Sequence, residues 1–399
     1  MFIESSARAS ARLCGDGMMN NFRPTFAEIH LKNLDYNLSS IMDVAGTSRF
    51  VCPMIKANAY GHGAVQIAQR ILKNAALPLG VALIEEALEL RAAGIKSEIL
   101  VFGGFDQSGA KQIIDAKLTP IVSQFEHLDI LKSLVTDSID IHIKFNTGMN
   151  RLGFNISEAD KVISFLKAHT QIKVKGILSH FHSSHLAHLE NSASFQQAQQ
   201  MIKMIDLFKD FGVHAHLLNS DAIVNFAQLK NQPQHFLNQY NWGFRPGIML
   251  YGYRTNEIES PIKIKPVMSL KSTITDVRQV KKGEVVSYNA TWTSDRDSQV
   301  AIVPIGYADG VHRLLSSRAQ VLVKNKKVPV IGRICMDFLM LDVTEISSTD
   351  LKKAEVVFFD DHSQGADVLA KSAETISYEI LTSVSSRVPR RYIDNGVQT

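Results

Sequence analysis

The chain has 399 residues, of which 45% are apolar and 21% are charged, a composition typical of a globular protein and unlike that of disordered or collagen-like chains. No uninterrupted apolar stretch approaches the roughly 18 to 20 residues that a membrane-spanning helix needs. Forty-three Lys and Arg against 39 Asp and Glu give a formal charge of +4, which is too small to indicate a nucleic-acid partner but is compatible with a small anionic ligand.

The cysteines and the N-terminal segment indicate a compartment. Cys14, Cys52 and Cys335 form no CxxC pair and are odd in number, which favours a reducing environment without structural disulfides. Residues 1–22 have no continuous apolar core of the kind that a secretory signal needs. We therefore expect a cytoplasmic protein, with residues 1–22 as a disordered N-terminal extension and folded sequence starting near Arg23.

Strand-like and helix-like segments alternate through the first two thirds of the chain. Helical spacing is clear at 85–93 and 194–209, and these helices fall between short apolar or β-branched runs. The runs are 51–55, 80–84, 98–102, 119–123, 140–145, 173–179, 214–218 and 243–250. Eight such repeats predict an α/β fold in which residues 23–264 form a (β/α)₈ TIM barrel; a doubly wound open sheet is the alternative.

The pattern changes from about residue 265. Strand-like runs follow one another, linked by Lys/Gly, Ser/Asp and Asn/Lys turns, at 267–280, 284–292, 299–305, 319–323 and 328–343. We therefore expect a separate, mostly-β domain over residues 265–399, with the boundary in the stretch 261–266. Chemistry in a barrel sits at the carboxyl ends of the strands, and the polar motifs of the first part fall there.

The sharpest local feature is the sequence MIKANAYGHG at 54–63, directly after the first apolar run. Lys56 leaves a buried strand for a Gly-rich loop, where partial desolvation would lower the pKa of its amine. Such an amine is a nucleophile toward carbonyl compounds. An ordinary lysine at the end of a strand is the alternative interpretation.

The motif around Lys56 resembles the cofactor-lysine motif of alanine racemases, the fold-type III pyridoxal phosphate enzymes that join a barrel to a β domain. Further motifs follow in the family order over about residues 23–393: KFNTGMNRLGF at 144–154, SHF at 179–181, NS at 219–220, FRPGIMLYG at 244–252, VSYNATW at 286–292, GYADG at 306–310, GRICMD at 332–337, TISYE at 375–379 and RVPR at 387–390. The resemblance implies interconversion of L-alanine and D-alanine with pyridoxal 5′-phosphate, supplying D-alanine for peptidoglycan in the bacterial cell wall.

The resemblance implies a set of cofactor contacts. Lys56 would hold the cofactor as an internal Schiff base, and His180 would stack near the pyridine ring. Hydroxyl groups and backbone N–H groups would bind the phosphate, as expected for an anion site. These phosphate contacts would come from Tyr60, Ser220, Gly247, Ile248 and Tyr378.

Arg245 is the most informative of the implied cofactor residues, because in this family it points at the pyridine nitrogen. Arginine does not give up its proton near neutral pH, so it cannot leave that nitrogen protonated as a carboxylic acid would. The electron sink is therefore weakened, which suits racemisation and disfavours transamination. A surface arginine in a salt bridge is the alternative interpretation.

Racemisation needs a base on each face of the planar intermediate, because a single base returns the proton to the side it came from. The resemblance implies Lys56 for the D face and Tyr288 for the L face, with Tyr288 reaching the site from the second chain of a homodimer. Met336 of that chain would bind the substrate carboxylate through its backbone N–H, and Arg151 would bind it through its guanidinium. A strand aromatic in a β core is the alternative for Tyr288.

Other positions match supporting residues of the family. Lys144 matches a lysine that carries a carbamate in many members and orients the arginine at 151. The access corridor to the site would be formed by Tyr307, Arg313, Arg333, Asp337 and Ile376. The chain departs from the family at three places, where Asp, Gly and an acidic residue are usual: Asn146, Asn289 and His185.

Three other classes of protein compete with this interpretation. The run His180, His182, His185 and His188 could indicate a barrel metallohydrolase, although no neighbouring Cys or carboxylate completes a ligand set, and we expect no metal. A pyridoxal phosphate carrier would share the lysine and the barrel but lack the second domain. A decarboxylase would have an acidic residue in place of Arg245. Serine remains open as a further substrate, because an apolar pocket rejects one added hydroxyl poorly.

Overall fold

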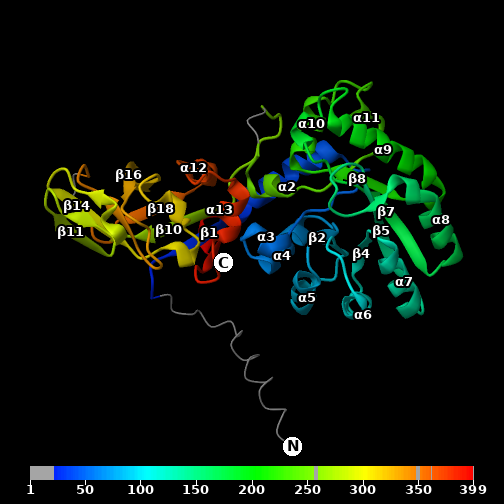
Figure 1. Cartoon of the computed structure of the whole chain (residues 1–399), viewed down its shortest axis with the longest axis horizontal. Helices are drawn as coiled ribbons and strands as arrows, with labels where there is room; N and C mark the ends of the chain where they lie inside the picture. Colours follow the sequence, from blue (N-terminus) through cyan, green and yellow to red (C-terminus); the bar gives the residue numbers. More distant parts are fainter. Residues whose placement is uncertain (1–21, 256–258, 347–350, 361, 399) are drawn as a thin grey trace, which may run out of the picture.

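The computed structural model describes residues 22–255, 259–346, 351–360 and 362–398. Apart from Phe22, the expected N-terminal extension lies outside the described residues. The chain forms two parts that lie side by side, one built on a parallel sheet with helices around it and one rich in strands (Figure 1). No helix of these residues is both long and apolar enough to span a lipid bilayer.

The first part is a barrel of parallel strands. Its strands pair in the order β2 (Leu79–Val81), β3 (Ile99–Val101), β4 (Thr119–Val122), β5 (Ile139–Asn146), β7 (Ile172–Leu178), β8 (His214–Leu218) and β9 (Gly243–Phe244), and the short β6 (Phe154–Asn155) pairs with β5. Most of the strand residues are buried, as expected for parallel strands covered by helices.

The segment 51–55 closes the barrel. Val51 forms a parallel bridge with Phe244 of β9, and Met54 forms one with Gly80 of β2. The open doubly wound sheet is therefore excluded. The prediction of a strand at 51–55 was wrong in detail, because the segment forms two isolated bridges in place of a regular ladder, and Pro53 has no N–H group to donate toward β2.

The last predicted strand of the barrel is also shorter than expected. The run 243–250 forms only the two residues of β9, and a 3₁₀ helix, η4, follows at Ile248–Tyr251. The ring of Pro246 cannot donate to a ladder, which ends the strand there. This early end turns residues 245–248 toward the carboxyl edge of the barrel.

Helices pack around the barrel, and side chains cap several of them. Asp106, Ser192 and Asn219 each accept a hydrogen bond from a backbone N–H of the first turn that follows. The helices are α2 (Leu31–Ala45), α4 (Ala64–Asn74), α5 (Ile84–Ala92), α6 (Gln107–Asp115), α7 (Phe125–Leu134), α8 (Ala159–Ala168), α9 (Ala193–Leu207), α10 (Ser220–Gln228) and α11 (Phe236–Gln239).

The second part contains a large mixed sheet. Its strands pair in the order β11 (Asp276–Val280), β14 (Ser298–Val303), β17 (Leu339–Asp342), β16 (Lys326–Ile331), β15 (Gln320–Val323), β18 (Glu355–Phe359), β10 (Met268–Thr273), β1 (Phe26–His30), β19 (Arg390–Asp394) and β20 (Val397–Gln398). A separate hairpin joins β12 (Val285–Val286) to β13 (Trp292–Thr293), and two helices, α12 (Ala366–Ser372) and α13 (Ser377–Ser383), pack against each other.

Strand β1 lies in this second sheet, although the sequence assigns residues 23–264 to the barrel. It pairs antiparallel with β10 and parallel with β19, and its alternating Ala27 and Ile29 are fully buried. The period-two pattern predicts a half-buried strand, but only its tertiary partners decide which sheet it joins. The boundary near residue 264 stays a prediction.

A buried ion pair fastens the start of the described chain to the second part. Asp309 is fully buried and accepts two hydrogen bonds from Arg23, at 2.7 and 2.8 Å, and one from the backbone N–H of Gly306. The more distant Arg387 lies 3.6 Å from the same carboxylate. Such a carboxylate is costly to leave without its donors.

We expect Arg23→Ala to lower the free energy of unfolding by about 1–3 kcal/mol, because it leaves a buried carboxylate short of two donors. Urea unfolding followed by circular dichroism measures this. Arg278→Ala removes an exposed ion pair with Asp276 and is the matched control, with an expected loss below about 1 kcal/mol. Equal losses for the two variants would contradict a special role for the pair with Asp309.

Candidate active site

A cavity of about 330 Å³ opens at the carboxyl ends of the barrel strands. Lys144 stands near the end of β5, His180 follows β7, Ser220 follows β8 and Arg245 follows β9. Tyr378 reaches the cavity from α13 of the strand-rich part. The cavity therefore lies between the two parts. The predicted residues that line it are Lys56, Tyr60, Lys144, Arg151, His180, Ser220, Arg245, Gly247 and Tyr378.

Lys56 begins a left-handed turn, labelled α3 (Lys56–Tyr60). Residues 57–60 all have φ between 51 and 53°, a conformation that costs roughly 1–2 kcal/mol for each L-residue. Hydrogen bonds hold the turn: Asn58 accepts from the N–H of Ala64 at 2.7 Å, and Ala57 accepts from Gly61 at 2.9 Å. A Cβ on Gly61 would come within 2.3 Å of the carbonyl oxygen of Leu381, so glycine lets α13 pack directly on the turn.

Glu86 binds this turn from outside and was missed at the sequence level. Its carboxylate accepts hydrogen bonds from the backbone N–H of Ala57 at 2.5 Å, of Ala82 at 2.8 Å and of Leu83 at 3.1 Å. Ala82 and Leu83 line the cavity beside Lys56. A glutamate three residues after the start of a helix was a usable signal for the bond to Leu83, but nothing in the sequence indicates the bond to residue 57.

Positive charge dominates the cavity. Burial lowers the pKa of the Lys56 amine, the nearby Arg151 lowers it further, and Glu86 opposes the shift. Lys144 is almost fully buried, and burial together with Arg151 lowers its pKa to about 8. A cavity with these cations suits an anionic ligand, and its two amines lose their protons more readily than ordinary lysines do.

Arg245 is buried and points its donors at acceptors of the barrel. It donates to the carbonyl oxygens of Ser179 at 2.7 Å and of His216, and its NH1 lies 3.0 Å from Nδ1 of His216. Burial lowers the pKa of Arg245 to about 10, which still leaves it protonated near neutral pH. The guanidinium can therefore donate hydrogen bonds but cannot accept them. Because Arg245 is buried and bonds to carbonyl oxygens and an imidazole, the interpretation as a surface salt bridge was wrong.

Hydroxyl and backbone N–H groups gather at one end of the cavity. The hydroxyl oxygen of Ser220 accepts from the N–H of Gly247 at 3.1 Å, and a Cβ on Gly247 would come within 2.5 Å of the Tyr60 hydroxyl oxygen. Burial raises the pKa of Tyr60 and of Tyr378, so both phenols keep their protons and can donate. Ile248 follows Gly247 as the first residue of η4 and is fully buried. This donor set fits a phosphate group.

Of the four histidines after β7, only His180 lines the cavity. His180 lines the cavity, and burial, followed by the charge of Arg245, lowers its pKa to about 3, so its ring is neutral. His182 and His185 are exposed, and Nδ1 of His188 contacts the carbonyl oxygen of His185 at 2.9 Å. In the described part of the chain, no group of three or more His, Cys, Asp or Glu is placed to hold a metal ion.

The remaining predicted residues lie on the strand-rich part. Within the described residues, the cavity wall does not include Tyr288 or Met336, whose exposed fractions are 67% and 53%. The backbone N–H of Tyr307 binds the carbonyl oxygen of Cys335, and the Ser287 hydroxyl binds that of Arg333, so these segments form one surface. Three of the predicted corridor residues are exposed, namely Tyr307, Ile376 and Arg313, while Asp337 forms an ion pair with Arg387 at 2.7 Å.

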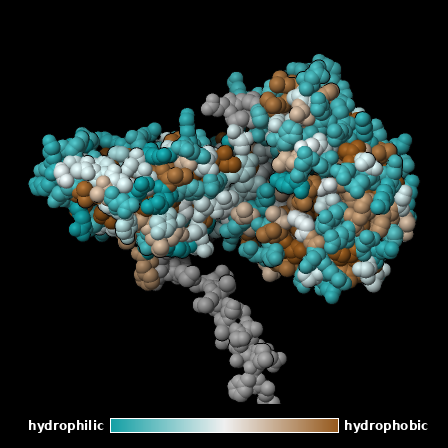
Figure 2. Space-filling model, in the orientation of Figure 1, coloured by the Kyte–Doolittle hydropathy of each residue, from teal (hydrophilic) through white to brown (hydrophobic). Residues whose placement is uncertain are grey.

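Figure 2 shows hydrophobic patches interrupting a mainly hydrophilic surface on both parts.

Two departures from the family pattern have local explanations. The side-chain oxygen of Asn146 accepts from the N–H groups of Gly148 and Asn150, at 3.1 and 2.9 Å, a turn-closing task that an aspartate performs equally well. Asn289 has a φ of 62°, in the region that favours glycine, and asparagine is among the side chains that tolerate it.

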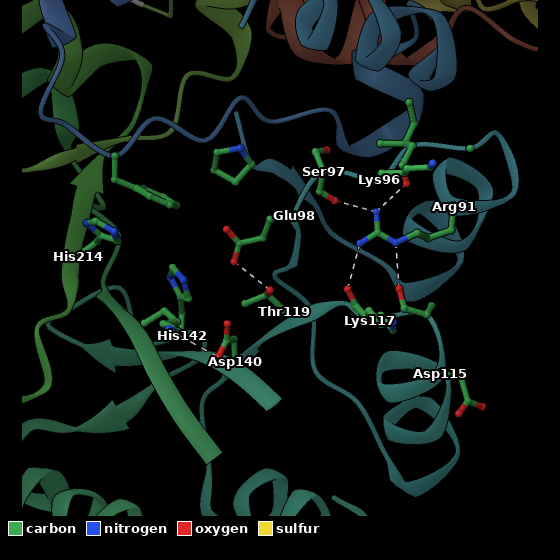
Figure 3. Close-up of a pocket in the computed structure, with 16 residues that line it drawn as sticks. Arg91, Lys96, Ser97, Glu98, Asp115, Lys117, Thr119, Asp140, His142 and His214 are labelled. Carbon is green, nitrogen blue, oxygen red and sulfur yellow. Dashed lines mark hydrogen bonds and ion pairs between the residues drawn. The ribbon is translucent and has the colours of Figure 1, made fainter. Parts of the chain in front are cut away.

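A second, larger opening of about 930 Å³ lies at the other end of the barrel, around the first residues of the strands (Figure 3). Arg91 there donates to the carbonyl oxygens of Ile95, Ser97, Ala116 and Lys117, and so joins two loops. Barrel enzymes place their chemistry at the carboxyl ends of the strands, which favours the smaller cavity as the active site.

Comparison with known proteins identifies the family of the chain. Sequence models of the alanine racemase N-terminal and C-terminal domains match residues 29–255 and 267–392. An alanine racemase of Clostridium novyi is 36% identical over 95% of this chain and 98% of its own length. "Alanine racemase 2" of Caldanaerobacter subterraneus is 34% identical over 95% of this chain and 97% of its own.

Solved structures agree with these relatives. An alanine racemase of Clostridium difficile 630 superimposes with a TM-score of 0.85 at 32% identity, covering 94% of this chain and 97% of that one. A Bartonella henselae alanine racemase, described with covalently bound pyridoxal phosphate, gives a TM-score of 0.82 at 26% identity, covering 93% of this chain and 99% of that one.

We expect Glu86→Gln to lower the pKa of the Lys56 amine further, because it removes the negative charge that opposes the effects of burial and Arg151. The pH dependence of Lys56 acylation, followed by mass spectrometry on protein freed of carbonyl ligands, measures this. Glu85→Gln changes the exposed neighbour and is the matched control. An unchanged acylation profile in Glu86→Gln would show that its carboxylate has no electrostatic influence on the amine.

Proposed function

Because the chain belongs to the alanine racemase family of isomerases, we propose that it interconverts L-alanine and D-alanine with pyridoxal 5′-phosphate held on Lys56. One observation carries the proposal: the amine of Lys56, the donor-only Arg245 and the hydroxyl and amide groups around Ser220 line a single cavity. These groups match the aldehyde, the pyridine nitrogen and the phosphate of that cofactor.

The bound cofactor would draw electrons from the α-carbon of alanine and so make its α-hydrogen acidic. Tyr60, Ser220, Tyr378 and the backbone of residues 247–248 would bind the phosphate, and His180 would pack against the ring as a neutral imidazole. Arg245 would donate to the ring nitrogen without protonating it.

Two groups would move the proton. The Nζ atom of Lys56 would serve the D face, and the phenolic oxygen of Tyr288 would serve the L face. Tyr288 is exposed and stands apart from the cavity of its own chain, which supports a homodimer in which it completes the partner's site. The same arrangement would bring the backbone N–H of Met336 to the substrate carboxylate, opposite Arg151.

Supporting residues complete the proposal. Lys144 would orient Arg151, and its lowered pKa favours the neutral amine that carbamate formation requires. Tyr307, Arg313, Arg333, Asp337 and Ile376 would line the access corridor between the two chains. In the cell, we infer a cytoplasmic enzyme that supplies D-alanine for peptidoglycan.

The direct test is Lys56→Ala. We expect loss of the visible absorption of bound pyridoxal phosphate and a fall in racemisation of at least about 10³-fold, because both the anchor and one base disappear. Chiral chromatography of product from L-alanine and, separately, from L-serine measures the activity and its breadth. Lys96→Ala, at the other end of the barrel, is the control and should retain both properties. Wild-type protein that forms no D-alanine with cofactor present would exclude the proposal.

Mixing chains tests the shared site. Lys56→Ala and Tyr288→Phe homodimers should each be nearly inactive, whereas a heterodimer should contain one site with both native bases and recover up to about half the activity per dimer. Differently tagged chains, refolded together and purified through both tags, provide the heterodimer. If that heterodimer is as inactive as its parents, Tyr288 does not act across the interface.

A further inference from the structure

Two buried imidazoles lie inside the barrel below the candidate site. His142 of β5 and His216 of β8 are 1% and 0% exposed, and Nδ1 of His142 lies 2.8 Å from Nε2 of His216. Their ring planes cross at 76°. Phe50 packs against both rings, at centroid distances of 5.7 and 5.0 Å, so the same aromatic ring contacts both imidazoles.

Two glycines make room for this pair. A Cβ on Gly176 of β7 would come within 2.2 Å of Nδ1 of His142, and a Cβ on Gly243 of β9 would come within 2.7 Å of Cβ of His216. Neither glycine has a positive φ, so backbone conformation does not require a glycine at either position. The strands therefore leave space at two places for these rings, in a region where barrels usually pack branched apolar side chains.

The pair continues upward to Arg245. The guanidinium NH1 lies 3.0 Å from Nδ1 of His216, on the other side of the ring from His142. The contacts thus run from His142 through His216 to the arginine that lines the cavity. At its lower end, His142 also lines the larger opening, beside His214 and Asp140 (Figure 3).

Because arginine only donates hydrogen bonds, the series of contacts from His142 through His216 to Arg245 has one hydrogen-bond direction. Arginine has donors and no acceptor, so Nδ1 of His216 must accept and carry no proton. A neutral His216 then holds its proton on Nε2 and donates it to Nδ1 of His142. His142 in turn holds its own proton on Nε2. Burial, as the largest cause, lowers the pKa of both rings, that of His142 to about 3, so both are neutral near physiological pH.

We propose that His142 is a positioning residue for racemisation: by accepting the Nε2 proton of His216, it fixes the tautomer whose Nδ1 receives Arg245 and so aims the guanidinium. The role in catalysis rests on the proposed function, while the hydrogen-bond direction does not. In the other tautomer, His216 would present an N–H group to the guanidinium. Two donors would then face each other in a buried site, and Arg245 would have to move.

The first experiment measures the tautomers themselves. Nitrogen NMR of the wild-type holoenzyme labelled with ¹⁵N-histidine, assigned with His142→Asn, should show unprotonated Nδ1 and protonated Nε2 in His216, and the same in His142. This readout needs no activity, so it stands even if the protein does not racemise alanine. A protonated Nδ1 in either ring would overturn the proposal.

The second experiment separates positioning from core packing. His142→Asn keeps an acceptor near the place of Nδ1, whereas His142→Leu keeps bulk and removes the acceptor. We expect His142→Leu to lower kcat for alanine about tenfold with little change in KM, and to alter the visible absorption of bound cofactor. The reason is that His216 loses the acceptor that fixes its tautomer and, through it, the orientation of Arg245. His142→Asn should stay within about twofold of wild type.

His214→Asn is the matched control, because His214 also lines the lower opening and stacks on Phe50 but lies outside the path from His142 to Arg245. It should resemble wild type. Wild-type kcat and absorption in His142→Leu would overturn the proposal, as would equal losses in His142→Asn and His142→Leu. If His142→Leu fails to fold, the NMR assignment and His142→Asn still decide the matter.

Discussion

The candidate site depends on the hydrogen bonds that hold residues 51–55 between the two edges of the parallel sheet. Cys52 donates to the carbonyl oxygen of Phe244 at 2.9 Å, and Ile55 donates to that of Gly80 at 2.8 Å. These bonds close the barrel and place Lys56 at its carboxyl edge. The left-handed turn that follows is tolerated because a closed barrel, α13 and Glu86 constrain it from three sides.

Burial determines the electrostatics of the cavity more than net charge does. The excess of four positive charges over the whole chain is small, yet Lys56, Lys144, Arg151 and Arg245 all line one cavity. Burial makes the two lysines less basic, whereas the arginine stays protonated near neutral pH although burial lowers its pKa to about 10. The same cavity therefore combines amines that lose their protons more readily than ordinary lysines with a cation that can only donate hydrogen bonds.

The two parts of the chain contribute differently to this chemistry. The barrel supplies the lysine, the arginines and most of the anion-binding groups, whereas the strand-rich part adds Tyr378 to the cavity of its own chain. In the proposed homodimer, the second chain would cover the exposed surface around Tyr288 and Met336. The backbone bonds that join residues 307 and 335 keep this surface in one shape before any partner binds.

The sequence by itself determined the alternation of strands and helices and the change to a strand-rich part, because these follow from local periodicity. It also indicated nine of the residues that line the cavity, because its motifs follow the order of a known family. Only the tertiary structure decided that β1 joins the second sheet, that residues 51–55 bridge two edges, that Glu86 binds the lysine turn and that His142 reaches Arg245 through His216. Each of these depends on hydrogen bonds between groups far apart along the chain. Local sequence carries no record of such partners, since the same donors and acceptors can bond in many ways until packing removes the alternatives.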